Sequence, residues 1–143
     1  MGLHWKDRRM RCIIAGTRNL VRPDPNEKWK YDLADVRFIK NTLTRIVEEE
    51  IDWWFESVTH IVSGCARGPD VVGQWWAKDK GLEVIKMPAD WDTHGKSAGF
   101  LRNSEMVESA EAAIALWDGS SKGTEDLINK ALSNELMIHV EYF

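Results

Sequence analysis

The sequence predicts an α/β protein: a three-layer α/β/α Rossmann-like domain whose parallel five-stranded sheet has the strand order 3-2-1-4-5. Two observations support this fold class. Short apolar runs that end at glycine or proline alternate with longer segments in which apolar residues recur at helical spacing. Parallel strands need such helical crossovers, and the resulting sheet is covered by helices on both faces. The alternation therefore indicates a doubly wound sheet whose winding direction reverses between the first and fourth strands.

Length and composition restrict the class of protein. The 143 residues, 43% hydrophobic and 29% charged, fit a single domain over residues 1–143, with residues 1–11 as a polar N-terminal tail. The chain has neither a membrane-spanning apolar run nor a signal-peptide pattern, which predicts a cytoplasmic protein without a membrane partner. The net charge of −4 makes nucleic acid an unfavourable partner. In the cytoplasm, Cys12 and Cys65 are expected to be free thiols.

The first half of the chain supplies two strands and two helices. Residues 12–15 are a continuous apolar run that stops at a glycine, which is typical of a strand buried on both faces. Apolar residues at helical spacing predict an amphipathic helix over residues 35–49. Residues 61–64 predict the second strand, which enters a tight glycine turn and then a helix with Pro69 in its first turn. Gly81 fits the left-handed position that ends this helix.

The second half continues the alternation. Its predicted elements are a third strand (82–87), a long polar connection (89–99), a helix (101–110), a fourth strand (112–117), a glycine-rich turn (118–124), a helix with Thr124 as its N-cap, and a last strand (137–140).

Glycines and polar residues follow several of the predicted strands. Ligands in doubly wound sheets bind beyond the carboxyl ends of the strands, where the winding reverses. Glycine lets the backbone approach a phosphate, and a helix N-terminus adds about 0.3–1 kcal/mol, so charge-assisted hydrogen bonds of about 1.5–3 kcal/mol each must supply most of the affinity. The expected ligand-binding residues are Gly16, Thr17, Arg18, Gly64, Arg67, Gly68, Asp90, Trp91, Lys96, Arg102, Asp118, Gly119, Ser121, Gly123 and Thr124.

Some residues near the strand exits allow two interpretations. Asp90 and Asp118 either contact the ligand or cap turns. Trp91 and Trp117 are the candidates to stack on a base. His94 fits an ordinary loop histidine better than an acid or base, and Cys65 fits a small buried residue better than a reactive thiol.

Metal, triad and cofactor chemistry lack their usual patterns in this sequence. No group of His, Cys and Asp residues has the spacing of a zinc site. A nucleophile elbow, a Walker-type phosphate loop and the dinucleotide fingerprint are also missing. The sequence therefore predicts no metal site and no cofactor, and the expected partner is a small phosphorylated molecule.

Short ungapped motifs follow one another along residues 12–132. They are 14–18 (IAGTR), 63–70 (SGCARGPD), 76–77 (WA), 88–91 (PADW), 95–99 (GKSAG), 102–103 (RN) and Met106. Together they resemble the YspA-type branch of the SLOG superfamily, whose relatives include nucleotide and ADP-ribose sensors, the LOG phosphoribohydrolases and the Rossmann-like domain of DprA. The resemblance implies a Rossmann-like fold, a bacterial or phage protein, a nucleotide-derived ligand and, because relatives pair through helices, a homodimer.

The resemblance to the LOG enzymes is partial. These enzymes carry an arginine followed four positions later by a methionine, which Arg102 and Met106 match, and a Gly-Thr pair that residues 123–124 match. Their catalytic glutamate lies three positions after that threonine, where this sequence has Leu127. An oxocarbenium-like transition state needs a closely placed carboxylate, so the sequence retains the phosphate-binding half of the site and departs from the hydrolytic half.

Three functions follow from these patterns. The first is binding of a nucleotide or an ADP-ribose-like ligand by a sensor module. The second is LOG-like hydrolysis of nucleoside monophosphates, for which Arg102, Asp118 and Asp126 are the candidate catalytic residues. The third, a DprA-like contact with single-stranded nucleic acid, fits the negative net charge poorly.

Overall fold

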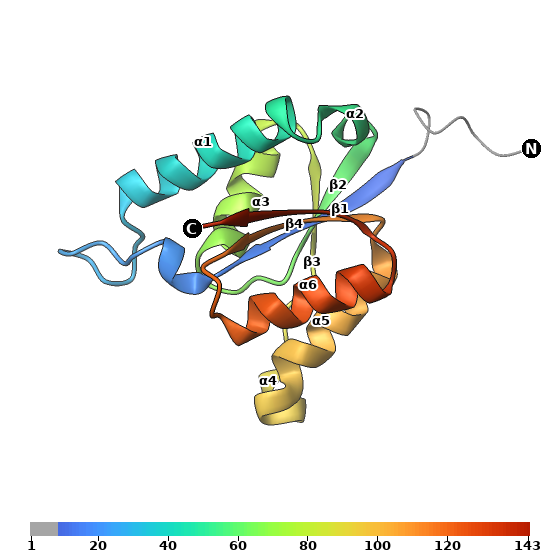
Figure 1. Ribbon diagram of the computed structural model, residues 1–143. Helices are drawn as coiled ribbons and strands as arrows, with labels where there is room; N and C mark the ends of the chain where they lie inside the picture. Colours follow the sequence, from blue (N-terminus) through green and yellow to red (C-terminus); the bar gives the residue numbers. More distant parts are fainter. Residues whose placement is uncertain (1–8) are drawn as a thin grey trace, which may run out of the picture.

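The computed structural model describes residues 9–143 as a five-stranded sheet between two layers of helices (Figure 1). Its strand pairings are parallel and the order is β3-β2-β1-β4-β5, which confirms the predicted Rossmann-like fold class and strand order. The strands are β1 (Met10–Gly16), β2 (Val58–Ser63), β3 (Glu83–Lys86), β4 (Ala112–Trp117) and β5 (Met137–Tyr142).

β1 and β4 form the centre of the sheet and are apolar on both faces. The residues of β1 from 12 to 15 and of β4 from 112 to 116 are buried, as expected for central strands of a parallel sheet. The register aligns Gly16 with Leu116, so the two strands end at the same level. From there the chain turns toward opposite faces of the sheet, which opens space between the two strand ends.

One face of the sheet is covered by α1 (Leu33–Glu49), α2 (Asp52–Phe55) and α3 (Pro69–Asp79) (Figure 1). The apolar stripe of α1, which includes Ile39 and Leu43, packs together with Trp76 of α3 against β1, β2 and β4. Pro69 begins α3 as predicted, because its fixed φ suits the first helical turn. Gly81 follows α3 with φ of +74°, which confirms its left-handed position.

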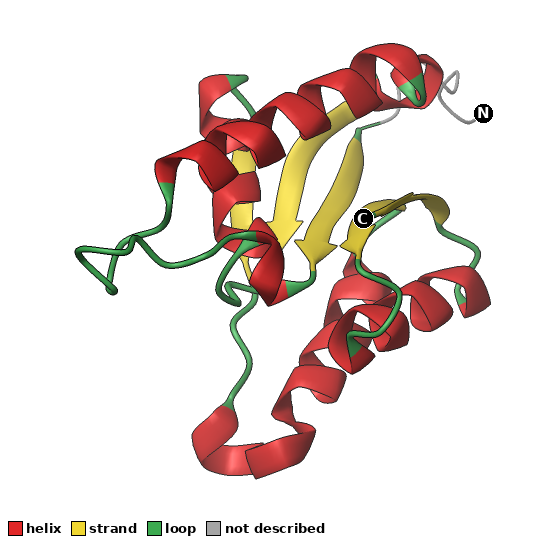
Figure 2. Ribbon diagram, turned by 60° about the vertical axis from the view of Figure 1, so that its left-hand side comes forward, coloured by secondary structure: helices red, strands yellow, loops and turns green. Residues whose placement is uncertain are grey.

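The other face is covered by α5 (Ala98–Ser109) and α6 (Lys122–Ser133). Met106 of α5 and Leu127 of α6 are buried with Ile13 and Val62 of the sheet. A short helix, α4 (Trp91–His94), and two 3-10 turns, η2 (Arg18–Leu20) and η3 (Gly95–Ser97), complete the described elements. Figure 2 shows α4 projecting beyond the edge of the sheet toward which the strands point. The carboxyl edge is therefore bordered by α4, η2 and the start of α6.

The first strand begins earlier than the sequence predicts. Residues 1–8 of the predicted tail lie outside the described residues, but Met10 and Arg11 belong to β1. Met10 is buried and its amide donates to the Ser57 carbonyl at 2.9 Å. The prediction of a tail was wrong at these two residues. Arg11 is polar and exposed, but at the amino end of a strand its side chain can point into solvent while its backbone stays paired in the sheet.

The polar connection 89–99 is also more regular than predicted. It contains α4 and η3, and Ala98 already begins α5. Asp90 starts this segment as the N-cap of α4, since its carboxylate accepts a hydrogen bond from the Thr93 amide at 3.2 Å. A local cap rather than an apolar pattern forms this helix, so hydrophobic periodicity did not reveal it.

Thr124 is not the N-cap of the last helix. Ser121 occupies the N-cap position, and Thr124 lies buried inside the first turn of α6. The turn after β4 closes within residues 118–121, because Asp118 accepts hydrogen bonds from the amides of Ser120 and Ser121 at 2.9 Å. The helix therefore starts three residues earlier than an N-cap at Thr124 predicts.

The structure of residues 9–143 also bears on disulfides, membrane-spanning helices and metal-ligand groups. Cys12 and Cys65 are free thiols. No helix in this part of the chain is both long enough and apolar enough to cross a bilayer. Within the same residues, no three His, Cys, Asp or Glu side chains are grouped in a way that could hold a metal ion.

Candidate ligand-binding site

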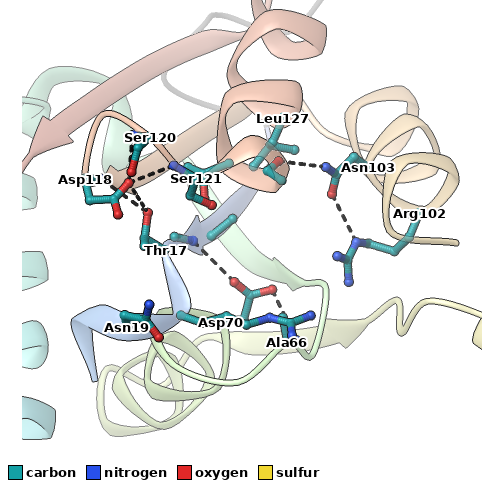
Figure 3. Close-up of a pocket in the computed structure, with 15 residues that line it drawn as sticks. Thr17, Asn19, Ala66, Asp70, Arg102, Asn103, Asp118, Ser120, Ser121 and Leu127 are labelled. Carbon is teal, nitrogen blue, oxygen red and sulfur yellow. Dashed lines mark hydrogen bonds between the residues drawn. The ribbon is translucent and has the colours of Figure 1, made fainter. Parts of the chain in front are cut away.

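A cavity of about 440 Å³ opens at the carboxyl edge of the sheet, between the ends of β1 and β4 (Figure 3). This is the point where the strand order reverses, and the volume lies within the range of about 300–1,000 Å³ that is usual for small-molecule sites. The elements that border the cavity are the exits of β1, β2 and β4, the first turn of α6, one turn of α5 and the start of α3. The predicted residues that line it are Gly16, Thr17, Arg18, Arg102, Asp118, Ser121, Gly123 and Thr124.

The turn after β4 is held in shape by Asp118. One oxygen of its carboxylate accepts hydrogen bonds from the amides of Ser120 and Ser121, and also from the Thr17 hydroxyl at 3.3 Å. These two amides hold the pKa of Asp118 below its ordinary value. Asp118 therefore caps a turn and ties it to the exit of β1, while it also lines the cavity.

The first turn of α6 borders the cavity through Gly123 and Thr124. Ser121 is the N-cap, and none of the described side chains forms a capping hydrogen bond there. A Cβ atom added at Gly123 would meet no atom of the protein within 4 Å, so the space beside its Cα is open. The uncapped start of a helix carries partial positive charge and free donors, which suits a negatively charged group.

Asp70 lies at the floor of the cavity, with only 3% of its surface exposed (Figure 3). Its two carboxylate oxygens accept hydrogen bonds from the amides of Gly16 and Ala66, both at 3.3 Å. Burial raises the pKa of Asp70 to about 6, although the nearby charges of Arg102 and Arg18 oppose that shift. Asp70 thus joins the exits of β1 and β2 and places a titratable group below the ligand space.

Arg102 reaches the cavity from α5 and is fixed by the protein. Its Nε donates to Asn103 Oδ1 at 3.0 Å, and its Nη1 donates to the Gly64 carbonyl. The buried Asn103 in turn donates to the Gly123 carbonyl at 3.1 Å and so ties α5 to the start of α6. The other terminal nitrogen of Arg102 has no hydrogen-bond partner among the described residues and can bind a ligand.

Gly64 and Gly68 have packing roles next to this arginine. A Cβ at Gly64 would lie 2.5 Å from Nη1 of Arg102 and 2.9 Å from Asp70 Oδ2, so a larger residue there would have to displace these two side chains. At Gly68, φ is +92° and a Cβ would lie 2.7 Å from the Arg18 carbonyl oxygen. The β2 turn therefore packs closely against the β1 exit and Arg102, and Ala66 is its residue that lines the main cavity.

Arg18 is the exposed cation of the site. It lines the main cavity and two adjoining ones, of about 170 Å³ and 250 Å³. Its guanidinium has no hydrogen-bond or ion-pair partner in the described part of the chain, and its charge stabilises the ionised form of Asp70. A side chain in this position can turn toward an anion without breaking an existing contact.

Several predicted residues lie outside the lining of the main cavity. Arg67 lines the 250 Å³ cavity with Arg18, and its guanidinium carbon lies 5.6 Å from the centre of the Tyr31 ring. Lys96 is exposed on η3, and Asp90 is engaged as the cap of α4. Gly119 has φ of +85° in the turn after β4, and Gly64 and Trp91 line the 170 Å³ cavity.

The carboxylates considered for hydrolysis are placed differently. Asp126 lies outside the cavity lining; it accepts a hydrogen bond from Asn103 at 3.0 Å and forms an ion pair with Lys130 at 2.9 Å. Leu127, three positions after Thr124, lines the cavity and is buried. The side chain that α6 places there is therefore apolar and offers no carboxylate.

The polar lining residues that the sequence did not predict are Asn19, Asp70, Asn103 and Ser120. Two of them had a signal. Asp70 follows the proline that starts α3, so its side chain had to lie in the first turn of a helix at a strand exit. Asn103 adjoins Arg102 in one of the quoted motifs. Ser120 contributes through a turn whose geometry the sequence does not show.

A phage protein is similar to part of this chain. The Gene 61 protein of Mycobacterium phage D29 is 40% identical over 77 residues, which are 50% of this chain and 62% of the phage protein. The chain thus spans less than two thirds of that relative's length. No family model and no solved structure matches the chain.

Proposed function

We propose that this protein is a cytoplasmic sensor module that binds a nucleotide or a nucleotide-derived, ADP-ribose-like molecule in the carboxyl-edge cavity. One observation carries the proposal. The uncapped start of α6 and the side chains of Arg18 and Arg102 border the same cavity, at the position where doubly wound sheets hold their ligands.

The energetics favour a phosphate held by several weak contributors. A helix start contributes about 0.3–1 kcal/mol, which is too little to hold a hydrated dianion alone. Charge-assisted hydrogen bonds add about 1.5–3 kcal/mol each. Arg102 is already oriented by Asn103 and Gly64, so little side-chain entropy is lost when it binds. Arg18 is exposed and must be ordered by the ligand.

The test is thermal stabilisation by AMP, ADP and ADP-ribose, measured for the wild type and for Arg18→Ala. A ligand that binds only the folded state raises Tm by mass action. We expect concentration-dependent shifts in the wild type and a loss of most of the shift in Arg18→Ala. Arg37→Ala, at an exposed position of α1, is the matched control and should respond as the wild type does. Absence of shifts with all three nucleotides, or equal shifts in Arg18→Ala, contradicts the proposal.

LOG-like hydrolysis is the second candidate, since Arg102 and Asp118 both line the cavity. Leu127 and the ion-paired Asp126 count against it, because neither offers a free carboxylate to an oxocarbenium-like state. Chromatographic detection of free base from nucleoside monophosphates, abolished in Asp118→Asn, would establish hydrolysis. Binding without release of base leaves the sensor function.

A further inference from the structure

A second cavity, of about 170 Å³, adjoins the main one at the carboxyl edge. The two share Arg18, Ala66 and Arg102 as lining residues, so the guanidinium of Arg102 borders both. The rest of the second lining comes from the β2 exit, the chain just after β3, and Trp91. A ligand with its phosphate in the main cavity therefore has a neighbouring compartment for its other end.

Trp91 gives this second cavity an aromatic wall. It is the first residue of α4, and 51% of its surface is exposed although its side chain is large and apolar. A Cβ placed at Gly99 would lie 3.5 Å from the far edge of the indole ring and 3.8 Å from Nη2 of Arg102. The ring and the guanidinium thus approach the same point of α5. Both are flat groups on which an aromatic ring can stack.

Three of the residues that line the second cavity offer no free amide hydrogen for reading the edge of a ring, so the donors that border it are mainly the guanidinium groups of Arg18 and Arg102. The Cys65 amide already donates to Ser63 Oγ at 3.2 Å, and the Ala66 amide donates to Asp70 at 3.3 Å. Pro88 has no amide hydrogen. A ring bound here would be held by stacking more than by hydrogen bonds, and stacking accepts every base because every base has a π-face.

We infer that this second cavity is a base subsite, in which Trp91 stacks on the nucleobase of a ligand whose phosphate occupies the main cavity, with little discrimination among bases. The inference rests on the proposed function and specifies its ligand class. It predicts that AMP and GMP bind with similar affinity and that ribose 5-phosphate, which has no base, binds more weakly than either.

The experiment measures the dissociation constants of AMP, GMP and ribose 5-phosphate by calorimetry for the wild type and three variants. Trp91→Ala should weaken both nucleotides by about 5- to 150-fold and leave ribose 5-phosphate unchanged. Trp91→Phe keeps a flat ring and should restore most of the affinity. Trp53→Ala is the control, because Trp53 is similarly exposed, at 59%, but lies on α2, and it should change nothing.

The outcomes separate the base subsite from the phosphate site. If AMP and ribose 5-phosphate bind the wild type equally, or if Trp91→Ala leaves AMP binding unchanged, the base subsite is wrong and the phosphate site stands. If Trp91→Ala weakens ribose 5-phosphate as much as AMP, Trp91 acts by shaping the phosphate site, and the stacking role is wrong. If none of the three compounds binds the wild type, the base subsite is wrong, and the proposed function fails with it when ADP and ADP-ribose also give no thermal shift.

Discussion

The turns that follow β2 and β4 look alike in the sequence, since each places glycines between a buried strand and a helix. In the β2 turn, the amides of Cys65, Ala66 and Gly68 all donate to side chains of the protein itself. In the β4 turn, Gly123 and Thr124 begin α6 beside the cavity, and no side chain among residues 9–143 caps them. Glycine marks a tight turn in both cases. Whether a turn can bind an anion depends on which of its amides remain free.

An aspartate next to each turn has opposite properties: Asp70 in the first turn of α3, after the β2 turn, and Asp118 directly after β4. Asp70 is buried and its pKa is raised, whereas Asp118 is exposed and its pKa is lowered by the amides that it binds. Because its charged form is buried, Asp70 lowers the free energy of unfolding at neutral pH. A carboxylate with a perturbed pKa that faces a cavity is typical of a functional site. The β2 turn is therefore the scaffold of the site, and the β4 turn is its open side.

The largest expected effect is the pH dependence that Asp70 adds to stability. Burial raises the pKa of its carboxyl from 3.8 to about 6 in the folded chain. Between these values the folded protein holds a proton that the unfolded chain has released, so this group makes the free energy of unfolding fall as the pH rises. Relative to the wild type, the free energy of unfolding of Asp70→Asn should rise by about 3 kcal/mol between about pH 4 and about pH 7. Urea unfolding at each pH measures this difference.

Asp118→Asn is the matched control for that experiment. Because the pKa of Asp118 is lowered in the folded protein, its carboxylate stabilises the fold above the ordinary titration range and loses this contribution as the pH falls. The stability of Asp118→Asn relative to the wild type should therefore change with pH in the opposite direction. A pH-independent difference for Asp70→Asn would refute the role given to its burial.

The next effect compares alanine at one glycine of each turn. Gly64→Ala places a Cβ 2.5 Å from Arg102 Nη1, and overpacking of this kind should lower the free energy of unfolding by about 1–3 kcal/mol. Gly123→Ala meets open space in a helical turn and should raise it by up to about 1 kcal/mol. In return, Gly123→Ala should weaken AMP binding, because the methyl group occupies ligand space. Equal stability of the two variants in urea unfolding would show that the turns do not differ as described.

The smallest effect is the salt dependence of binding. Arg18 is exposed, so its attraction for a phosphate is screened by salt, whereas Arg102 is half-buried and held by Asn103. AMP affinity in the wild type should fall as sodium chloride is raised, and Arg18→Ala should show a shallower fall. Calorimetric titrations at several salt concentrations give the two slopes. Parallel slopes would remove Arg18 from the phosphate contacts.

The sequence predicted the fold better than it predicted the site. Buried central strands appear as unbroken apolar runs, so residues 112–117 could be assigned with correct bounds. The sequence could not show in the same way that the amides of the turn after β2 are already hydrogen-bonded to side chains of the protein. The Gly68 amide donates to the Tyr31 hydroxyl at 3.0 Å, and that partner lies 37 residues earlier in the chain. Arg67 likewise turns toward Tyr31, so the neighbouring strand exit supplies Arg18 to the cavity in its place.

The comparison of the two turns can be tested residue by residue with amide NMR spectra during a titration with ribose 5-phosphate. This probe carries a phosphate and no base, so ring currents do not disturb the result. We expect the largest shifts at the amides of Gly123 and Thr124 and only small shifts at those of Cys65, Ala66 and Gly68. Shifts concentrated at the β2 turn, or no shifts at either turn, would contradict it.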